Sequence, residues 1–288
     1  MARCALGSII VTFSWLVATT ATAGSILVPP GPGTPVQDAI DAAAPGDTIR
    51  LVIGSYPEHI TITKPLRIQG ATSLAPQYAD TTHFEGLCGA GPVITVASDD
   101  VKVVDVAIGS DAEGAVQVHG RNNVKLKRLF ALSNCDPVTQ PAYDVAQSTR
   151  VRLQRVWAAG FGLRPVGPAG IRVADTPALG KVRVQRVISG GYDVGLLLQN
   201  NGDSSVIVSS SHLNYSEKGL VLQGTSHALI AHNRLFVNTD VGIEIEAGSN
   251  DNVLAGNTID DSITDVLDNG TGNCWRNTTY TTGSVPNC

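Results

Sequence analysis

The sequence predicts an all-β protein, a right-handed parallel β-helix solenoid with a short N-terminal capping helix. The first observation is a repeat: Gly170-Ile-Arg-Val, Gly195-Leu-Leu-Leu, Gly219-Leu-Val-Leu and Gly242-Ile-Glu-Ile begin units that are 25, 24 and 23 residues apart. Each unit contains short alternating strands between polar corners and no helical spacing, which is typical of a solenoid. The second observation is composition: aromatic residues make up only 5% of the chain, so aliphatic side chains must fill the interior.

Residues 1–23 have the features of a secretory signal peptide. Arg3 provides a positive charge, residues 5–18 are apolar, and Ala21-Thr22-Ala23 is a small-residue cleavage site. The apolar stretch is shorter than the roughly 20 residues that span a bilayer. We therefore expect an exported protein, secreted or periplasmic, with no membrane span.

The rest of the chain is predicted to form one β-helix domain over residues 34–288, preceded by a Pro- and Gly-rich flexible leader over 24–33. Residues 34–46 predict the capping helix, because Thr34 suits the N-cap, Pro35 the first helical position and Gln37 a capping box. Such a helix would cover the open end of the stack of coils. We expect roughly eight coils after it, with corner asparagines turned inward at Asn233 and Asn257.

Four cysteines remain after the signal peptide, namely Cys88, Cys135, Cys274 and Cys288. An even number in an exported protein predicts two disulfides, for which three pairings exist. We favour Cys274–Cys288, which would close a tail over residues 269–288, and Cys88–Cys135, which would join loops from successive coils.

Residues 36–70 resemble a known kind of solenoid. The run Val36-Gln-Asp-Ala-Ile-Asp-Ala-Ala-Ala-Pro-Gly-Asp-Thr-Ile, then Gly-x-Tyr-Pro-Glu at 54–58 and Leu66-Arg-Ile-Gln-Gly70, is similar to the cap and first coil of the pectin-lyase-like superfamily. The later units resemble its generic repeats, so the likeness extends over nearly the whole mature chain. It implies a right-handed parallel β-helix. It implies no single activity, because that superfamily contains polysaccharide lyases, glycoside hydrolases, uronate epimerases, esterases and adhesins.

Positive charge is concentrated in one part of a chain whose net charge is −5. Residues 121–186 contain twelve Lys or Arg and three acidic residues. Three units read Val124-Lys-Leu-Lys-Arg-Leu, Val151-Arg-Leu-Gln-Arg-Val and Val182-Arg-Val-Gln-Arg-Val, which predicts two outward rows of cations. The first row is Lys125, Arg152 and Arg183; the second is Arg128, Arg155 and Arg186, which we expect His212 and Arg234 to continue.

Like charges on neighbouring strands about 4.8 Å apart repel one another, and a polyanion lying along the rows would relieve that repulsion. We expect an acidic polysaccharide as partner, with a plain solvated surface as the alternative. Nucleic acid is not expected for an exported, acidic chain, and we expect a monomer. The predicted substrate-binding residues are Lys125, Arg128, Arg152, Arg183, Tyr192 and Arg234, and the predicted catalytic residues are Arg155, Arg186 and His212.

The sequence does not decide whether the protein is an enzyme. Asn238-Thr-Asp240 with Asp260 and Asp261 resembles part of the carboxylate set of polygalacturonase-type hydrolases, but the Gly-His-Gly and Arg-Ile-Lys of that family are absent downstream. If the protein is an enzyme, a polysaccharide lyase or uronate epimerase fits better than a glycoside hydrolase. The alternative is a non-catalytic surface, adhesion or structural β-helix protein.

No cofactor or metal is expected from the sequence. Acidic residues concentrated in the last coils could bind calcium, but the Gly-rich calcium repeat of β-rolls is absent. The six histidines show no spacing typical of metal ligands.

Overall fold

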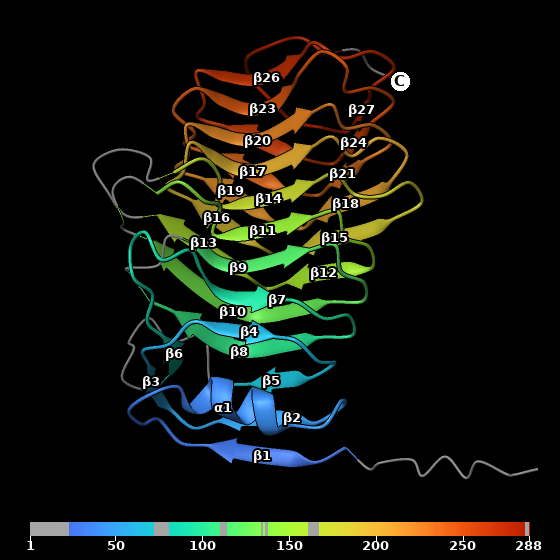
Figure 1. Ribbon diagram of the computed structural model, residues 1–288. Helices are drawn as coiled ribbons and strands as arrows, with labels where there is room; N and C mark the ends of the chain where they lie inside the picture. Colours follow the sequence, from blue (N-terminus) through green and yellow to red (C-terminus); the bar gives the residue numbers. More distant parts are fainter. Residues whose placement is uncertain are drawn as a thin grey trace, which may run out of the picture.

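The computed structural model describes residues 23–71, 81–109, 114–133, 135, 138–160, 167–285 and 288. Short parallel strands stack coil upon coil along one axis, from β1 at one end to β26 and β27 at the other (Figure 1). The predicted parallel β-helix is therefore confirmed, whereas the signal peptide lies outside the described residues except for Ala23. In the part of the chain that the structure describes, no helix is long and apolar enough to cross a membrane.

The strands form three parallel stacks, which we call A, B and C. Stack A runs the full length of the solenoid, and each strand pairs with the equivalent strand of the next coil. Its strands are β1 (Ser25–Val28), β2 (Thr48–Leu51), β5 (Arg67–Gln69), β8 (Lys102–Ile108), β10 (Lys125–Ser133), β12 (Val151–Gln154), β15 (Lys181–Gln185), β18 (Ser205–Ser209), β21 (Leu229–Ala231), β24 (Val253–Ala255) and β27 (Cys274–Arg276).

Stack B follows stack A after a bend, and the long strands β8 and β10 pass through both stacks. Its other strands are β3 (Gly54–Tyr56), β6 (Thr82–Phe84), β13 (Trp157–Gly160), β16 (Ile188–Gly190), β19 (His212–Asn214), β22 (Arg234–Phe236) and β25 (Thr258–Asp260).

Stack C completes each coil and forms a separate sheet. Its strands are β4 (Ile60–Ile62), β7 (Pro92–Val96), β9 (Gly114–His119), β11 (Tyr143–Ala146), β14 (Ile171–Ala174), β17 (Val194–Gln199), β20 (Lys218–Gln223), β23 (Val241–Ile245) and β26 (Thr264–Asp268).

Alternation along each strand separates the interior from the surface. In stack A, Leu126, Leu153 and Val184 are fully buried and lie directly over one another, while the residues beside them point outward. A fully buried aliphatic side chain contributes about 1.5–3 kcal/mol relative to an exposed one. Repeated over every coil, this burial gives the solenoid one continuous core.

In the coils from β8 to β21, one residue in the left-handed region makes the bend between stacks A and B. Asp105, Arg128, Arg155, Arg186, Ser210 and His232 occupy this position with φ of 52–61°. A single left-handed residue reverses the alternation of side chains, so the next strand again directs its aliphatic residues inward.

An inward-turned asparagine directly follows the left-handed residue of this bend in the coils of β21 and β24. Asn233 and Asn257 are 2% and 1% exposed, and Asn233 Nδ2 donates to Asn257 Oδ1 at 3.0 Å and to the Val208 carbonyl at 3.1 Å. The predicted inward asparagines are confirmed. Their amides satisfy buried backbone groups where the chain turns and the strand pairing is interrupted.

Helix α1 (Pro35–Ala42) covers the N-terminal end next to β4. The Gln37 amide bonds the edge of that strand, because the Thr61 N–H donates to Gln37 Oε1 at 2.8 Å and Gln37 Nε2 donates to the Thr61 carbonyl at 3.4 Å. The predicted capping helix is confirmed and blocks a strand edge that would otherwise be open to pairing.

The capping of this helix differs from the sequence prediction. The Thr34 hydroxyl makes no cap hydrogen bond. Instead Glu58, 3% exposed, accepts from the Val36 and Gln37 amides at 2.9 and 3.0 Å, and Lys64 Nζ donates to the Asp41 and Ala43 carbonyls at 2.7 and 3.0 Å. An anion at the N-terminus and a cation at the C-terminus of the helix both match its dipole.

Two predicted boundaries are wrong. Residues 24–33 are not a flexible leader throughout, because Ser25–Val28 forms β1 and pairs in parallel with β2. Residues 269–288 are not only a tail, because Cys274–Arg276 forms β27 and pairs with β24. With the coil that holds α1 and the coil through β26 and β27, the solenoid has about ten turns rather than roughly eight.

Both favoured disulfides are present. Cys88 is bonded to Cys135 across connections between stacks B and C, and Cys274 is bonded to Cys288 at the C-terminal end. Each closes a loop of the unfolded chain and so lowers the entropy of that state.

We predict that Glu58→Ala lowers the free energy of unfolding by about 1–3 kcal/mol, because one buried and one partly buried helix amide lose their acceptor. Urea denaturation of wild type and variant gives this difference. Glu217→Ala, at an exposed position, is the matched control and is expected to change stability by less than about 0.5 kcal/mol. Equal effects of the two substitutions would show that Glu58 does not cap the helix.

Candidate functional site

Five cationic side chains lie one above another on the outside of stack A. The pairing register places Arg67 beside Lys102, Lys102 beside Lys125, Lys125 beside Arg152 and Arg152 beside Arg183. We call these five residues the cation column. The predicted row of Lys125, Arg152 and Arg183 is confirmed in register and extends two coils further toward the N-terminus.

No acidic side chain of the described residues forms an ion pair with the cation column. Arg67 Nε is buried without a hydrogen-bond partner. The pKa of Lys102 is lowered, first by burial and then by the positive charges of Arg67, Lys127, Lys125 and Arg128. The column is therefore a line of mutually repelling charges, at about 1 kcal/mol for each contact in water-like surroundings.

The second predicted row is only partly confirmed. Arg128, Arg155 and Arg186 share the left-handed bend position, as the repeat predicted. Arg128, however, forms a two-pronged ion pair with Asp105, which raises its pKa through the hydrogen bond first and the opposite charge second. Arg128 is thus neutralised and is a poor candidate for binding an anion, whereas Arg155 and Arg186 are exposed.

His212 and Arg234 do not continue this row. Ser210 and His232 take the bend position in those coils, while His212 and Arg234 lie two residues later on stack B, in register with Ile188. The structure therefore places Arg155 and Arg186 together on neighbouring coils and His212 in a different column. The error arose because the bend residue varies in type along the repeat, so sequence spacing did not identify it.

The sequence prediction placed Tyr192 in a binding surface, but the structure places it in the core. Its side chain is 0% exposed within the core cluster, and burial raises the pKa of its hydroxyl. A side chain in this position does not contact a ligand on the surface. The substrate-binding role predicted for Tyr192 is therefore wrong.

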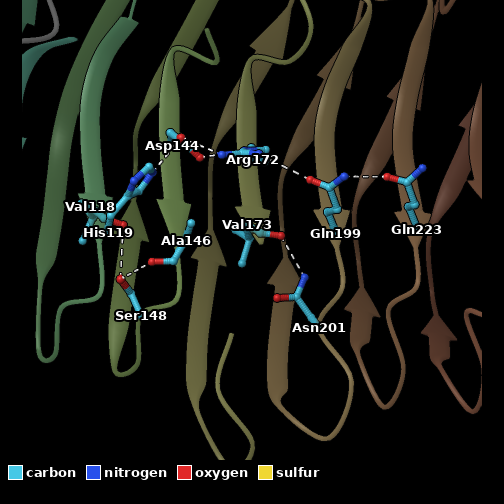
Figure 2. A network of polar contacts seen from close by, with 10 residues as sticks. All are labelled: Val118, His119, Asp144, Ala146, Ser148, Arg172, Val173, Gln199, Asn201 and Gln223. Atoms are coloured by element: carbon cyan, nitrogen blue, oxygen red, sulfur yellow. Dashed lines mark hydrogen bonds and ion pairs between the residues drawn. The ribbon is translucent and has the colours of Figure 1, made fainter. Parts of the chain in front are cut away.

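Figure 2 shows a polar network on the outside of stack C that the sequence did not predict. Asp144 accepts from Arg172 Nε and Nη2 at 2.8 and 2.9 Å and bonds His119 Nε2 at 2.8 Å. The network continues through Gln199, 3.4 Å from Arg172 Nη1, to Gln223, 2.8 Å from Gln199. These residues come from β9, β11, β14, β17 and β20, so the network crosses five coils.

Asp144 is held as a carboxylate in this network. Burial by itself would raise the pKa of the carboxyl, but the hydrogen bonds from His119 and Arg172 outweigh burial, and the pKa is lowered. The hydrogen bond that Arg172 donates to Asp144 in turn raises the pKa of Arg172. Both carboxylate oxygens are occupied, so Asp144 orients His119, whose side chain is 40% exposed, rather than acting as a free base.

One signal in the sequence could have located this network. His119 and Gln199 are the last residues of β9 and β17, and Asp144 and Arg172 are the second residues of β11 and β14. In each of these stack C strands the residue points outward, and the four strands belong to successive coils. The Lys- and Arg-rich units predicted the charges of stack A, because charges of one sign repeat there. The network on stack C has mixed charges and no repeating motif.

Comparison with known proteins identifies the fold. Residues 168–286, less than half of the chain, match a family described as periplasmic copper-binding protein (NosD). The search of curated proteins found no match. Among solved structures, pectate lyase Pel9A superposes with a TM-score of 0.60 at 14% identity, over 93% of this chain and 78% of that chain. The protein therefore has a parallel β-helix fold, as pectate lyase Pel9A does.

Two other β-helix structures are similar. The A-module of mannuronan C-5 epimerase AlgE4 from Azotobacter vinelandii has a TM-score of 0.51 at 14% identity, over 81% of this chain and 75% of that chain. ORF18 of Geobacillus virus E2 has a TM-score of 0.52 at 11% identity, over 88% of this chain and 62% of that chain. At these identities the likeness concerns the β-helix fold alone.

The described residues do not fit a copper centre. Among them no three His, Cys, Asp or Glu side chains lie close enough to hold a metal ion. The cysteines at 88, 135, 274 and 288 are all in disulfides, and the single methionine of the chain is Met1. Soft thiolate and thioether ligands, which copper(I) prefers, are therefore lacking in the β-helix.

We predict that Asp144→Asn destabilises the protein at neutral pH by about 2 kcal/mol, less than for fully buried ion pairs because Arg172 and His119 are partly exposed. Because folding lowers the pKa of Asp144, the ionised carboxylate stabilises the folded state at pH values above the ordinary Asp pKa of about 3.9. This contribution is lost as the pH falls through the lower pKa of the folded state.

Urea unfolding from pH 7 to pH 2 tests this prediction. The difference between wild type and Asp144→Asn should be constant near neutrality and shrink below pH about 4. Asp203→Asn, at a side chain that is 84% exposed, is the control. A difference that stays the same down to pH 2 would mean that the Asp144 carboxylate does not stabilise the fold through its charge.

Proposed function

We propose that this protein is an exported β-helix protein that binds an acidic polysaccharide along the cation column. One observation carries the proposal: five cations occupy equivalent positions of consecutive coils, and no described acidic side chain neutralises them. An extended polyanion with one carboxylate on each sugar repeats its charge along its length, as the column does. Burial first, and then repulsion from neighbouring cations, lowers the pKa of Lys102, and a bound polyanion would offset the repulsion.

The comparisons support the class of ligand and the compartment. Two similar structures are named as a pectate lyase and a mannuronan epimerase, and pectate and mannuronan are both acidic polysaccharides. The family matched by residues 168–286 is described as periplasmic. Two disulfides also suit an oxidising compartment outside the cytosol.

The proposal is one of binding and leaves modification of the glycan to experiment. Arg155 and Arg186 are neighbours, but His212 does not share their column. On stack C, Asp144 and Arg172 are occupied by each other. Lyase or epimerase chemistry is therefore the second outcome that the assay below distinguishes, beside a non-catalytic surface or adhesion role.

The test is retention of the protein on immobilised polygalacturonate and alginate at low and high salt, with and without calcium. Absorbance of unsaturated uronate ends is followed with the same polymers in solution. Salt-sensitive retention is expected. Growth in absorbance would add a lyase activity, and proton exchange without absorbance would add an epimerase activity. If neither polymer retains the protein at low salt, the cation column is only a solvated surface.

We predict that the double variant Arg152→Gln/Arg183→Gln binds the retained polymer about 30-fold more weakly at low salt, at about 1 kcal/mol for each cation. The salt dependence of the affinity should also become shallower, because fewer counterions are exchanged on binding. Arg50→Gln/Arg276→Gln is the matched control, since both residues are exposed on stack A but lie outside the cation column. Equal losses in the two double variants would mean that binding follows net charge and not the column.

A further inference from the structure

Aromatic residues are distributed unevenly in this protein. Tyr56, Phe84, Tyr143, Tyr192 and Trp275 are buried in the core. Phe130, Trp157, Tyr215 and Phe236 instead lie on the outside of stack B or directly after its strands, and we call these four residues the aromatic face. Trp157 is 40% exposed and Tyr215 is 61% exposed.

The rings of the aromatic face support one another in pairs. Phe130 and Trp157 are edge to face with centroids 5.3 Å apart, and Tyr215 and Phe236 are edge to face at 5.8 Å. Arg234 lies over the Phe236 ring, 5.0 Å from its centroid. Paired rings keep a fixed orientation, so they offer a pre-formed apolar surface rather than mobile side chains.

Small residues lie beside Trp157. The register places Ala159 opposite Gly190, next to the column of Trp157, Ile188 and His212. A Cβ at Gly190 would lie 2.1 Å from the Asn214 carbonyl oxygen, so this position excludes larger side chains. Trp157 and Ile188 are therefore flanked by small side chains, and the space beside Gly190 is filled by the Asn214 backbone.

Positive charge lies along the aromatic face from Trp157 to Arg234, whereas Asp260 of β25 is in register with Phe236 at its other end. Arg155 and Arg186 lie at the bend that joins it to stack A, and His212 and Arg234 lie on stack B itself. Strands β13, β16, β19 and β22 contain no acidic residue. A ligand that suits the part of this surface from Trp157 to Arg234 combines a flat apolar face with negative charge.

We propose that the aromatic face binds the sugar rings of an acidic polysaccharide, with the C–H faces of two non-adjacent pyranoses of one chain against Trp157 and against the Tyr215–Phe236 pair. A uronate ring carries an apolar face and a carboxylate, which matches the combination of rings and cations. Two coils separate β13 from β19, about 10 Å at the ordinary strand spacing, so each site would take a separate sugar of one chain. This inference rests on the proposed function and adds to it a second surface, across the bend from the cation column.

The tryptophan itself provides the measurement. Trp157 is 40% exposed, whereas Trp275 is 2% exposed. Acrylamide quenching of the full chain, minus that of Trp157→Phe, isolates the contribution of Trp157. Saturating oligogalacturonate or oligomannuronate is expected to lower this quenching constant at least about twofold, because a bound ring shields the indole from the quencher.

Affinity measurements on variants complete the test. Trp157→Ala and Tyr215→Ala are each expected to weaken binding of the uronate oligomer about tenfold, as truncation of an aromatic anchor does. Leu179→Ala is the control, because Leu179 is 87% exposed and lies outside stack B. Two positions are tested so that poor folding of one variant does not decide the result.

The outcomes separate this inference from the proposed function. If Arg152→Gln/Arg183→Gln weakens binding while the quenching of Trp157 is unchanged by ligand, the cation column binds the glycan and the aromatic face does not. If an oligothymidylate protects Trp157 and uronates do not, the ligand class is wrong. If protection depends on protein concentration without ligand, a second copy covers the face and the inference fails. If no uronate binds at low salt, both proposals fail.

Discussion

The parallel register between coils is the constraint on which the rest of this structure depends. Each strand pairs with the equivalent strand of the next coil, so residues at the same position of the repeat lie directly above one another. A side-chain type that recurs at one position of the repeat therefore forms a continuous row along the solenoid. Inward aliphatic residues become a continuous core, corner asparagines become hydrogen-bonded ladders, and outward cations become a column. The spacing of about 4.8 Å between strands brings all of them into contact.

A stack of this kind has to be closed at both ends, where strands and core would otherwise be exposed. At the N-terminus, helix α1 covers the edge of stack C, and Glu58 and Lys64 fix the two ends of the helix with opposite charges. At the C-terminus, Trp275 is 2% exposed, its Nε1 donates to Asp268 at 2.8 Å, and the Cys274–Cys288 disulfide holds the end of the chain. The closures use contacts that the repeat does not supply.

Two of the three stacks carry surface charge in different ways. On stack C, Asp144 neutralises Arg172 and bonds His119, and Lys218 pairs with Glu244 at 2.7 Å. On stack A, like charges are repeated without a partner in the described chain. The first arrangement stabilises the fold by itself, whereas the mutual repulsion of the second lowers stability. This difference is why we propose ligand binding at stack A and the adjoining aromatic face, and a structural role for the charges of stack C.

Much of the fold was determined by the sequence itself, because alternation and the period of the units are local properties of the chain. They predicted the solenoid, the capping helix, the inward asparagines and the row of Lys125, Arg152 and Arg183. Only the tertiary structure decided that Arg67 and Lys102 join this row, that Tyr192 is buried and that Asp144 meets His119. The neighbours in the cation column are 35, 23, 27 and 31 residues apart, since connections of different length separate equivalent strands. Spacing in the sequence does not reveal such partners, and the pairing of the strands does.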